Sequence, residues 1–175
     1  MPRIVICDVN VLVNAVTRAG APAEGAILAQ VPPRTTNPWA DTLGTLNSGQ
    51  DFVLATSPHI LWNVADVLIN AYRWRRVQVE VFVALLLEII SRTGGTYIDP
   101  QSRVSDCAAD EEDNRILELT LDADADLVVT EDHHLLELSP WRTVPIITAR
   151  EFAGRVAVAT RARARRQSER SGSSD

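Results

Sequence analysis

The sequence has little of several features that mark particular protein classes. It contains only two cysteines, Cys7 and Cys107, and their unrelated contexts give no disulfide framework. No apolar run approaches the roughly 18 residues that a membrane span needs, and the N-terminus lacks a basic region followed by a signal-type apolar segment. We therefore expect a cytoplasmic protein without membrane contact. Its 175 residues, 46% of them hydrophobic, suit a single globular domain.

Lysine is absent, so all 17 basic residues are arginine. The segment "DVN" after an apolar strand superficially resembles the nucleophile motif of phosphatases of the haloacid dehalogenase type. That fold normally needs a cationic residue, usually lysine, to hold its phosphate. The lack of lysine therefore places this class last among the candidate functions.

Acidic and basic residues are unevenly distributed along the chain. Eleven of the 23 acidic residues fall between Asp106 and Asp132, whereas residues 154–175 carry six arginines against two acids. We expect residues 1–154 to form the domain and residues 155–175 an arginine-rich, partly disordered tail, because the tail has almost no large apolar side chains. It is either a solvated extension or an arm for phosphates or an acidic partner. If it folds, it should continue the last helix.

Short apolar strands alternate with helical segments, which predicts an α/β fold with a mainly parallel sheet. Strands are expected at residues 3–7, 52–56, 96–98, 127–130 and 144–147. Helices are expected at residues 57–74, 77–93 and 111–125, with one or two short helices around residues 23–30 and 39–46. The first of the long helices has a clear start signal, with Ser57 as N-cap and Pro58 at the first helical position.

Two polar residues, Asp8 and Asn10, directly follow the first expected strand. Polar groups beside a buried segment cost free energy unless they find partners. Taken alone, the pair is equally consistent with a helix cap, in which Asp8 caps a helix starting near Val9 and Asn10 makes a local turn bond. The fourth expected strand repeats the arrangement with Thr130 and Asp132.

Three carboxylates are predicted to converge at one edge of the sheet. Sites in parallel sheets lie outside the carboxyl ends of the strands, where Asp8 and Asp132 fall, and Asp113 heads the preceding helix. Clustered carboxylates repel one another unless a cation neutralises them. An all-oxygen ligand set without a cysteine or histidine pattern indicates Mg²⁺ or Mn²⁺, ions that support phosphodiester cleavage.

Four segments together resemble a known family: "VICDVNVLVNA", "SPHILWNVADVL", "DEEDNRILELTLDADADLVVTEDHHLL" and "VPIIT". They are similar to successive landmarks of the PIN domain, the metal-dependent ribonuclease fold of VapC-type toxins, over about residues 4–152. The resemblance implies a three-layer α/β/α fold with a central, mainly parallel sheet of about five strands. It also implies cleavage of structured RNA to a product with a 5′ phosphate, with an antitoxin protein as partner. We further expect a homodimer.

The same resemblance implies roles for particular residues. Asp8, Asp113 and Asp132 match the metal-binding aspartates, and Asn10 and Thr130 complete the catalytic set. These five are the expected catalytic residues.

One position departs from the family pattern. The family usually has a glutamate in the helix after the second strand, where this chain has Asn63. Asparagine can coordinate through its carbonyl oxygen, but it brings no charge and cannot act as a base. Asp66, one turn further along the helix, and Asp110, one turn before Asp113, are candidates to replace it. The departure is the reason for an alternative, a degenerate PIN module that binds RNA or a protein without cleavage, although the nuclease remains the leading hypothesis because Asp8, Asn10, Asp113, Thr130 and Asp132 are all present.

Other features allow weaker predictions. Arg73, Arg75 and Arg76 either contact RNA phosphates or form a solvated helix end. His133 and His134 should point in different directions as neighbours on a helix, which favours surface or capping roles over metal ligation. The four tryptophans are assigned to packing or a dimer contact rather than to base stacking.

Overall fold

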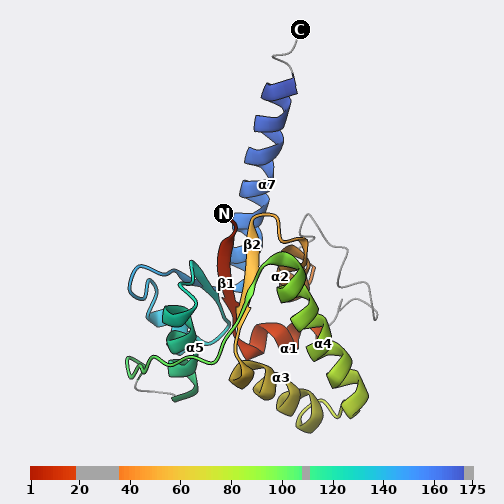
Figure 1. The fold of residues 1–175 in the computed structure, drawn as a ribbon, viewed down its shortest axis with the longest axis vertical. Coiled ribbons are helices and arrows are strands. Elements are labelled where there is room, and N and C mark those ends of the chain that lie inside the picture. The colour runs from red at the N-terminus through yellow and green to blue at the C-terminus, as the bar shows by residue number, and fades with distance from the viewer. Residues whose placement is uncertain (19–35, 108–110, 172–175) are drawn as a thin grey trace.

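The computed structural model of the protein describes residues 1–18, 36–107 and 111–171 (Figure 1). Strands and helices alternate through this part of the chain, as predicted. The elements are β1 (Arg3–Cys7), α1 (Val9–Thr17), α2 (Pro38–Ser48), β2 (Phe52–Thr56), α3 (Pro58–Asn70), α4 (Arg76–Thr93), β3 (Thr96–Tyr97), α5 (Glu111–Asp122), β4 (Leu127–Val129), α6 (His133–Glu137), β5 (Ile146–Ile147) and α7 (Ala149–Ser171).

The described strands form one sheet of five parallel strands in the order β3-β2-β1-β4-β5. β1 lies at the centre, where Val5 pairs with Leu54 of β2 on one side and with Leu127 of β4 on the other. Figure 1 shows α5 on one side of the sheet and α1, α2 and α4 on the other. Helices on both faces explain why β2 and β4 are buried along their whole length. The expected three-layer α/β/α architecture is confirmed.

The core lies between the sheet and its helices. Ile6, Leu12 and Leu117 are among its largest fully buried side chains. α7 joins it through Phe152, whose ring meets Phe52 edge to face with centroids 5.0 Å apart. Both cysteines are buried and free, which agrees with the expected lack of a disulfide framework.

The tryptophans mostly contribute to packing. The ring of Trp74 lies against Phe82, with centroids 6.5 Å apart, and Trp141 is buried. Trp39 is partly buried against the core, whereas Trp62 is 65% exposed. Packing thus accounts for three of the four.

α3 begins as predicted but ends earlier. Ser57 caps it and Pro58 is its first residue. The helix stops four residues before the predicted end at Trp74, since Arg73 takes a left-handed conformation with a φ of 60°. This reversal turns Trp74 back onto Phe82 of α4. The contact between Trp74 and Phe82 therefore accompanies the end of the helix.

Other predicted boundaries shift by a few residues. α5 ends at Asp122 rather than at residue 125, because Asp124 has a positive φ of 50°. β5 starts late because Val144 pairs with Trp141 in an isolated antiparallel bridge. The helix expected around residues 39–46 is present as the longer α2, capped by Asn37. The helix expected around residues 23–30 lies outside the described residues.

α7 crosses the predicted boundary at residue 154 without a break. One face of its first turns is buried, with Phe152, Ala153 and Val156, and Figure 1 shows its far end projecting away from the sheet and the other helices. Arg163 still contacts the domain, since its guanidinium donates to the side-chain oxygen of Gln50 at 2.8 Å. That residues 155–175 form a separate, partly disordered tail remains a prediction.

In the part of the chain that the structure describes, no helix combines the length and apolar character needed to span a bilayer.

Candidate active site

A pocket of about 450 Å³ lies at the carboxyl ends of β1 and β4. These neighbouring parallel strands end at the same edge of the sheet, so the residues that follow them meet there. Asp8, Asp113 and Asp132 all line the pocket, each brought by a different segment. The structure therefore gathers the three predicted aspartates, and it adds Asn10 and Asn63 to the lining.

Asp8 is the most constrained of these carboxylates. It is 9% exposed and is the N-cap of α1, where it accepts a hydrogen bond from the Val9 amide at 2.6 Å. Its other oxygen, Oδ2, accepts from Asn10 Nδ2 at 2.5 Å and from Thr130 Oγ1 at 2.6 Å. The helix-cap interpretation of Asp8 is therefore confirmed, since one oxygen caps α1 and the other accepts from the polar side chains, whereas its role in metal binding stays a prediction.

The environment of Asp8 perturbs its protonation. Burial raises the pKa of its carboxyl to about 6, although hydrogen bonds from Thr130 and Val9 act in the opposite direction. The negative charges of Asp113 and Asp132 raise this pKa further. The three carboxylates thus repel one another, as expected for a site that binds a cation.

Asn10 and Thr130 hold the polar residues in place. The fully buried Thr130 hydroxyl donates to Asp8 and accepts from the Asp132 amide at 2.9 Å. Asn10 donates to Asp8 and accepts from the Glu131 amide through Oδ1 at 3.1 Å. Both side chains therefore connect the end of β1 to the loop after β4.

Asp113 lies in the first turn of α5 and is only 6% exposed. The Cys107 thiol donates to its Oδ2 at a sulfur–oxygen distance of 3.4 Å. Asn114 fastens the same segment, accepting from the Cys107 amide at 2.9 Å and donating to the Cys107 carbonyl at 2.8 Å. Sequence reasoning missed Asn114, although an amide beside a predicted ligand at a helix start was the available signal.

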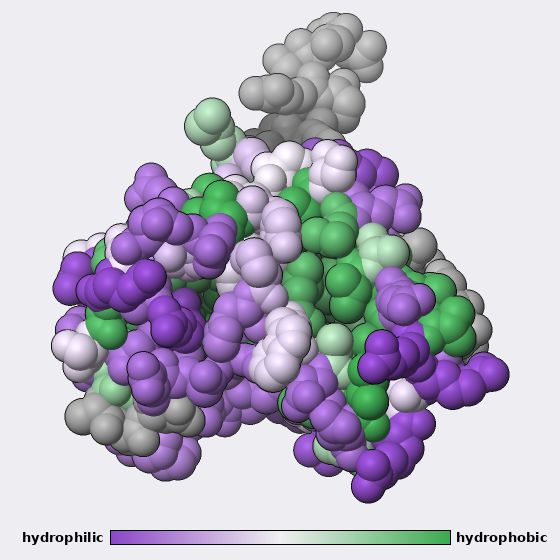
Figure 2. Space-filling model, turned by 60° about the horizontal axis from the view of Figure 1, so that its bottom comes forward, coloured by the Kyte–Doolittle hydropathy of each residue, from purple (hydrophilic) through white to green (hydrophobic). Residues whose placement is uncertain are grey.

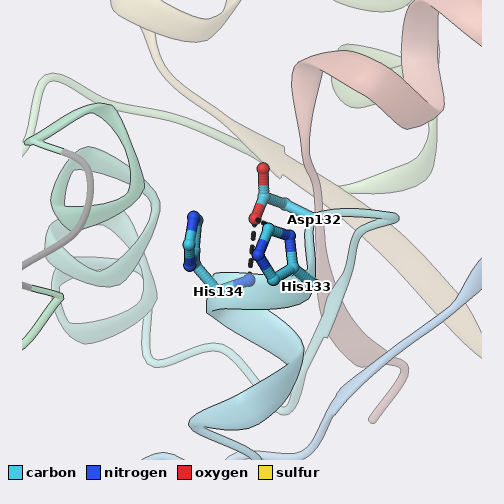
Figure 3. Close-up of side chains that lie close together, drawn as sticks. All are labelled: Asp132, His133 and His134. Carbon is cyan, nitrogen blue, oxygen red and sulfur yellow. Dashed lines mark hydrogen bonds and ion pairs between the residues drawn. The ribbon is translucent and has the colours of Figure 1, made fainter.

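Asp132 caps α6 by accepting from the His134 amide at 2.8 Å, and its side chain is 34% exposed. Figure 3 shows His133 and His134 beside this carboxylate at the start of the helix. The centroids of their two rings lie 3.8 Å apart, so the expectation that they point in different directions is wrong. Both residues lie in the first turn after Asp132, where their rings fold towards one another. One ligand atom from each of the three residues falls within 4.8 Å of the others.

Asn63 faces the pocket, but its partners were not foreseen. Its Nδ2 donates to Glu112 Oε2 at 2.9 Å and lies 3.1 Å from His59 Nε2. The same Glu112 oxygen is 2.6 Å from His59 Nε2. Sequence reasoning missed Glu112 and His59, which both line the pocket. The signal for Glu112 was its place beside Asp113 in the acidic first turn of α5.

The other predicted residues lie elsewhere. Asp66 is outside the pocket lining and accepts from Asn70 at 2.7 Å, whereas Asp110 lies outside the described residues. Arg73 and Arg75 are exposed in the connection between α3 and α4, and Arg76 is the exposed first residue of α4. None of the three lines the pocket, although Tyr72, which precedes Arg73 in the chain, does.

The pocket suits a hard divalent cation. Its acidic lining residues are Asp8, Glu112, Asp113 and Asp132, and the described lining contains no arginine. Carboxylate oxygens are the ligands that Mg²⁺ and Mn²⁺ prefer. Among the described residues, the group found with its ligand atoms all within 4.8 Å of one another is Asp132, His133 and His134, and not the three aspartates.

Two comparisons with known proteins gave different outcomes. No curated protein matches the chain. The family model for the PIN domain matches residues 3–134, which is well over half of the chain and includes all three aspartates. Because the family is generally one of metal-dependent nucleases, the match supports a hydrolytic, nuclease-type function. The chain belongs to the PIN domain family.

Proposed function

We propose that the protein is an endoribonuclease that holds Mg²⁺ or Mn²⁺ with Asp8, Asp113 and Asp132. The observation that carries this proposal is that three separate segments of the chain each bring an aspartate to one pocket. The pKa of Asp8 is raised mainly by burial and in smaller part by the charges of Asp113 and Asp132, and a cation would relieve this repulsion. Membership of the PIN family supports the same chemistry.

The chain's own residues prepare this site. When bound, a divalent ion supplies positive charge that activates water and stabilises the charge developing on the phosphodiester. Thr130 and Asn10 donate to the same oxygen of Asp8 and so fix the direction of its carboxylate. They act as positioning residues. We expect an RNA product with a 5′ phosphate, as the family resemblance implies.

RNA contacts are proposed for Arg73, Arg75 and Arg76. Their support is their exposure and their closeness in the chain to Tyr72, which lines the pocket, since arginines near a cleavage site attract the phosphates of the substrate.

A toxin role in the cytoplasm, restrained by an antitoxin, is the biology we propose. Its support is the similarity of the four motifs to those of VapC-type toxins. Figure 2 shows hydrophobic surface gathered towards the side of the molecule that carries α4, while the side of α5 is largely hydrophilic. Exposed apolar side chains on the α3–α4 segment support a protein contact, either with an antitoxin or in a homodimer. They are Trp62, Tyr72, Val77, Val81 and Leu87.

A second candidate function is supported by Asn63. An amide where the family usually has a glutamate favours a PIN module that binds RNA or a protein without cleaving.

RNA cleavage separates the two functions. Purified protein is incubated with several structured RNAs in Mg²⁺ or Mn²⁺, with a chelator control, and compared with the Asp8→Asn and Asp113→Asn variants. We expect cleavage that requires the metal and is lost in both variants. RNA binding without cleavage at saturating metal would favour the binding module. Cleavage that persists in a chelator or in both variants would refute the metal site.

A further inference from the structure

We propose that Glu112 supplies a fourth carboxylate to the metal site, held in position by His59 and Asn63. This inference rests on the proposed function, because it assigns a further residue to the same centre. It also assigns Asn63 a role as a positioning residue, in place of the role of metal ligand.

The contacts of Glu112 carry the inference. Its Oε2 lies 2.6 Å from His59 Nε2 and 2.9 Å from Asn63 Nδ2. These partners belong to α3, and they are separated from Glu112 by 53 and 49 residues. All three side chains line the pocket that contains Asp113. The carboxylate of Glu112 is therefore tied to the pocket although its side chain is 60% exposed.

The hydrogen-bonding roles are fixed by chemistry. An ionised carboxylate only accepts, so the 2.6 Å contact requires a proton on His59 Nε2, and the Asn63 amide must direct its NH₂ group to Glu112. Two donors from a neighbouring helix restrict the rotamers of a long, flexible side chain. Less conformational entropy is then lost when Glu112 engages a cation.

Residues 63 and 112 provide one negative charge between them. A carboxylate at position 63 would stand against Glu112 at the distance that the amide now occupies, and like charges so close repel strongly. The amide of Asn63 instead attracts Glu112. The side chain at position 63 therefore decides whether the charge comes from α3 or from α5.

Mn²⁺ binding to the metal-free, full-length protein tests this assignment. The dissociation constant is measured by calorimetry for the wild type and for Glu112→Gln. Glu111→Gln is the matched control, because it removes the same charge from the neighbouring exposed residue, which is not among those that line the pocket. We expect Glu112→Gln to weaken binding by about tenfold, in the range typical for residues that support a metal site, and Glu111→Gln to leave it within about twofold.

A rescue variant shows whether Glu112 contributes its charge to the metal site or only stabilises the local structure. Asn63→Glu in the Glu112→Gln background should restore most of the lost affinity, whereas Asn63→Glu alone should give little gain because the two glutamates repel each other. Thermal melting shows whether each variant is folded. Equal affinities for Glu112→Gln and Glu111→Gln, or no rescue by Asn63→Glu in folded protein, would overturn the inference and leave Glu112 as a surface partner of His59.

If the proposed metal site itself is wrong, the same titrations give a different result. Mn²⁺ then binds the wild type no more tightly than it binds Asp8→Asn. Loss of binding in Asp8→Asn together with unchanged binding in Glu112→Gln would refute only the role of Glu112.

Discussion

The pH dependence of stability in metal-free protein tests the environment of Asp8. Burial is the main cause that raises its pKa in the folded state to about 6 from the ordinary value of 3.8. Between these values the folded protein binds more protons than the unfolded chain does. The free energy of unfolding should therefore fall as pH rises from about 4 to about 6, and the full penalty of the ionised carboxylate should persist at higher pH.

The magnitude follows from the size of the shift. About two pKa units correspond to ~3 kcal/mol of differential stability. Asp8→Asn removes this pH-dependent penalty, but its amide has only one acceptor oxygen, so either Val9 or Thr130 and Asn10 lose their acceptor, at a cost of about 1–3 kcal/mol at any pH. The two effects largely cancel at neutral pH. We expect the variant to match the wild type within about 2 kcal/mol at pH 7.5 and to be clearly less stable near pH 4.

Urea unfolding in the presence of a chelator, at several pH values between 4 and 7.5, measures this difference. The stability of the wild type minus that of Asp8→Asn should decrease by about 2.5 kcal/mol across this range, because the unfolded chain is already partly ionised at pH 4. Subtraction removes the titration of all other groups that the substitution leaves unchanged. A difference that stays constant with pH would refute the reasoning, because Asp8 would then titrate alike in the folded and unfolded states.

Three further predictions concern other parts of the molecule. Asp66→Asn should keep the rate of Mn²⁺-dependent cleavage within about twofold of the wild-type rate, because Asp66 lies outside the pocket. A severe loss of rate would instead mean that Asp66 takes the place of the family's usual glutamate. Phe152→Ala should reduce the free energy of unfolding by about 3–5 kcal/mol in urea titrations, since the ring is fully buried against Phe52; a loss under about 1 kcal/mol would contradict this packing. Truncation after Arg161 should leave the melting temperature nearly unchanged and should weaken RNA binding more at low salt than at high salt. If the truncated and full-length proteins bind RNA equally at every salt concentration, the arginine-rich end is a solvated extension without a role in RNA binding.

Much of the fold could be predicted because its signals are local. Short β-branched runs marked all five strands, and Ser57 with Pro58 marked the start of α3. The convergence of Asp8, Asp113 and Asp132 followed from the rule that parallel strands end at one edge. Element ends were less predictable, since the stop of α3 depends on the packing of Trp74 against Phe82 of another helix.

The missed residues of the site depend on contacts between distant segments. Glu112 meets His59 and Asn63 only when α5 and α3 meet at the pocket, and a separation of about fifty residues gives no periodic signal in the sequence. The rings of His133 and His134 come together because they lie beside a capping carboxylate at a helix start, where the side-chain directions of a regular helix are a poor guide.

Anomalous scattering from crystals soaked in Mn²⁺ tests the central claim most directly. We predict a peak in the pocket at the ends of β1 and β4, among the carboxylates of Asp8, Asp113 and Asp132. Crystals of Asp8→Asn under the same soak should lose it. A peak held only by Asp132, His133 and His134, or no peak at a Mn²⁺ concentration that supports RNA cleavage, would contradict the account.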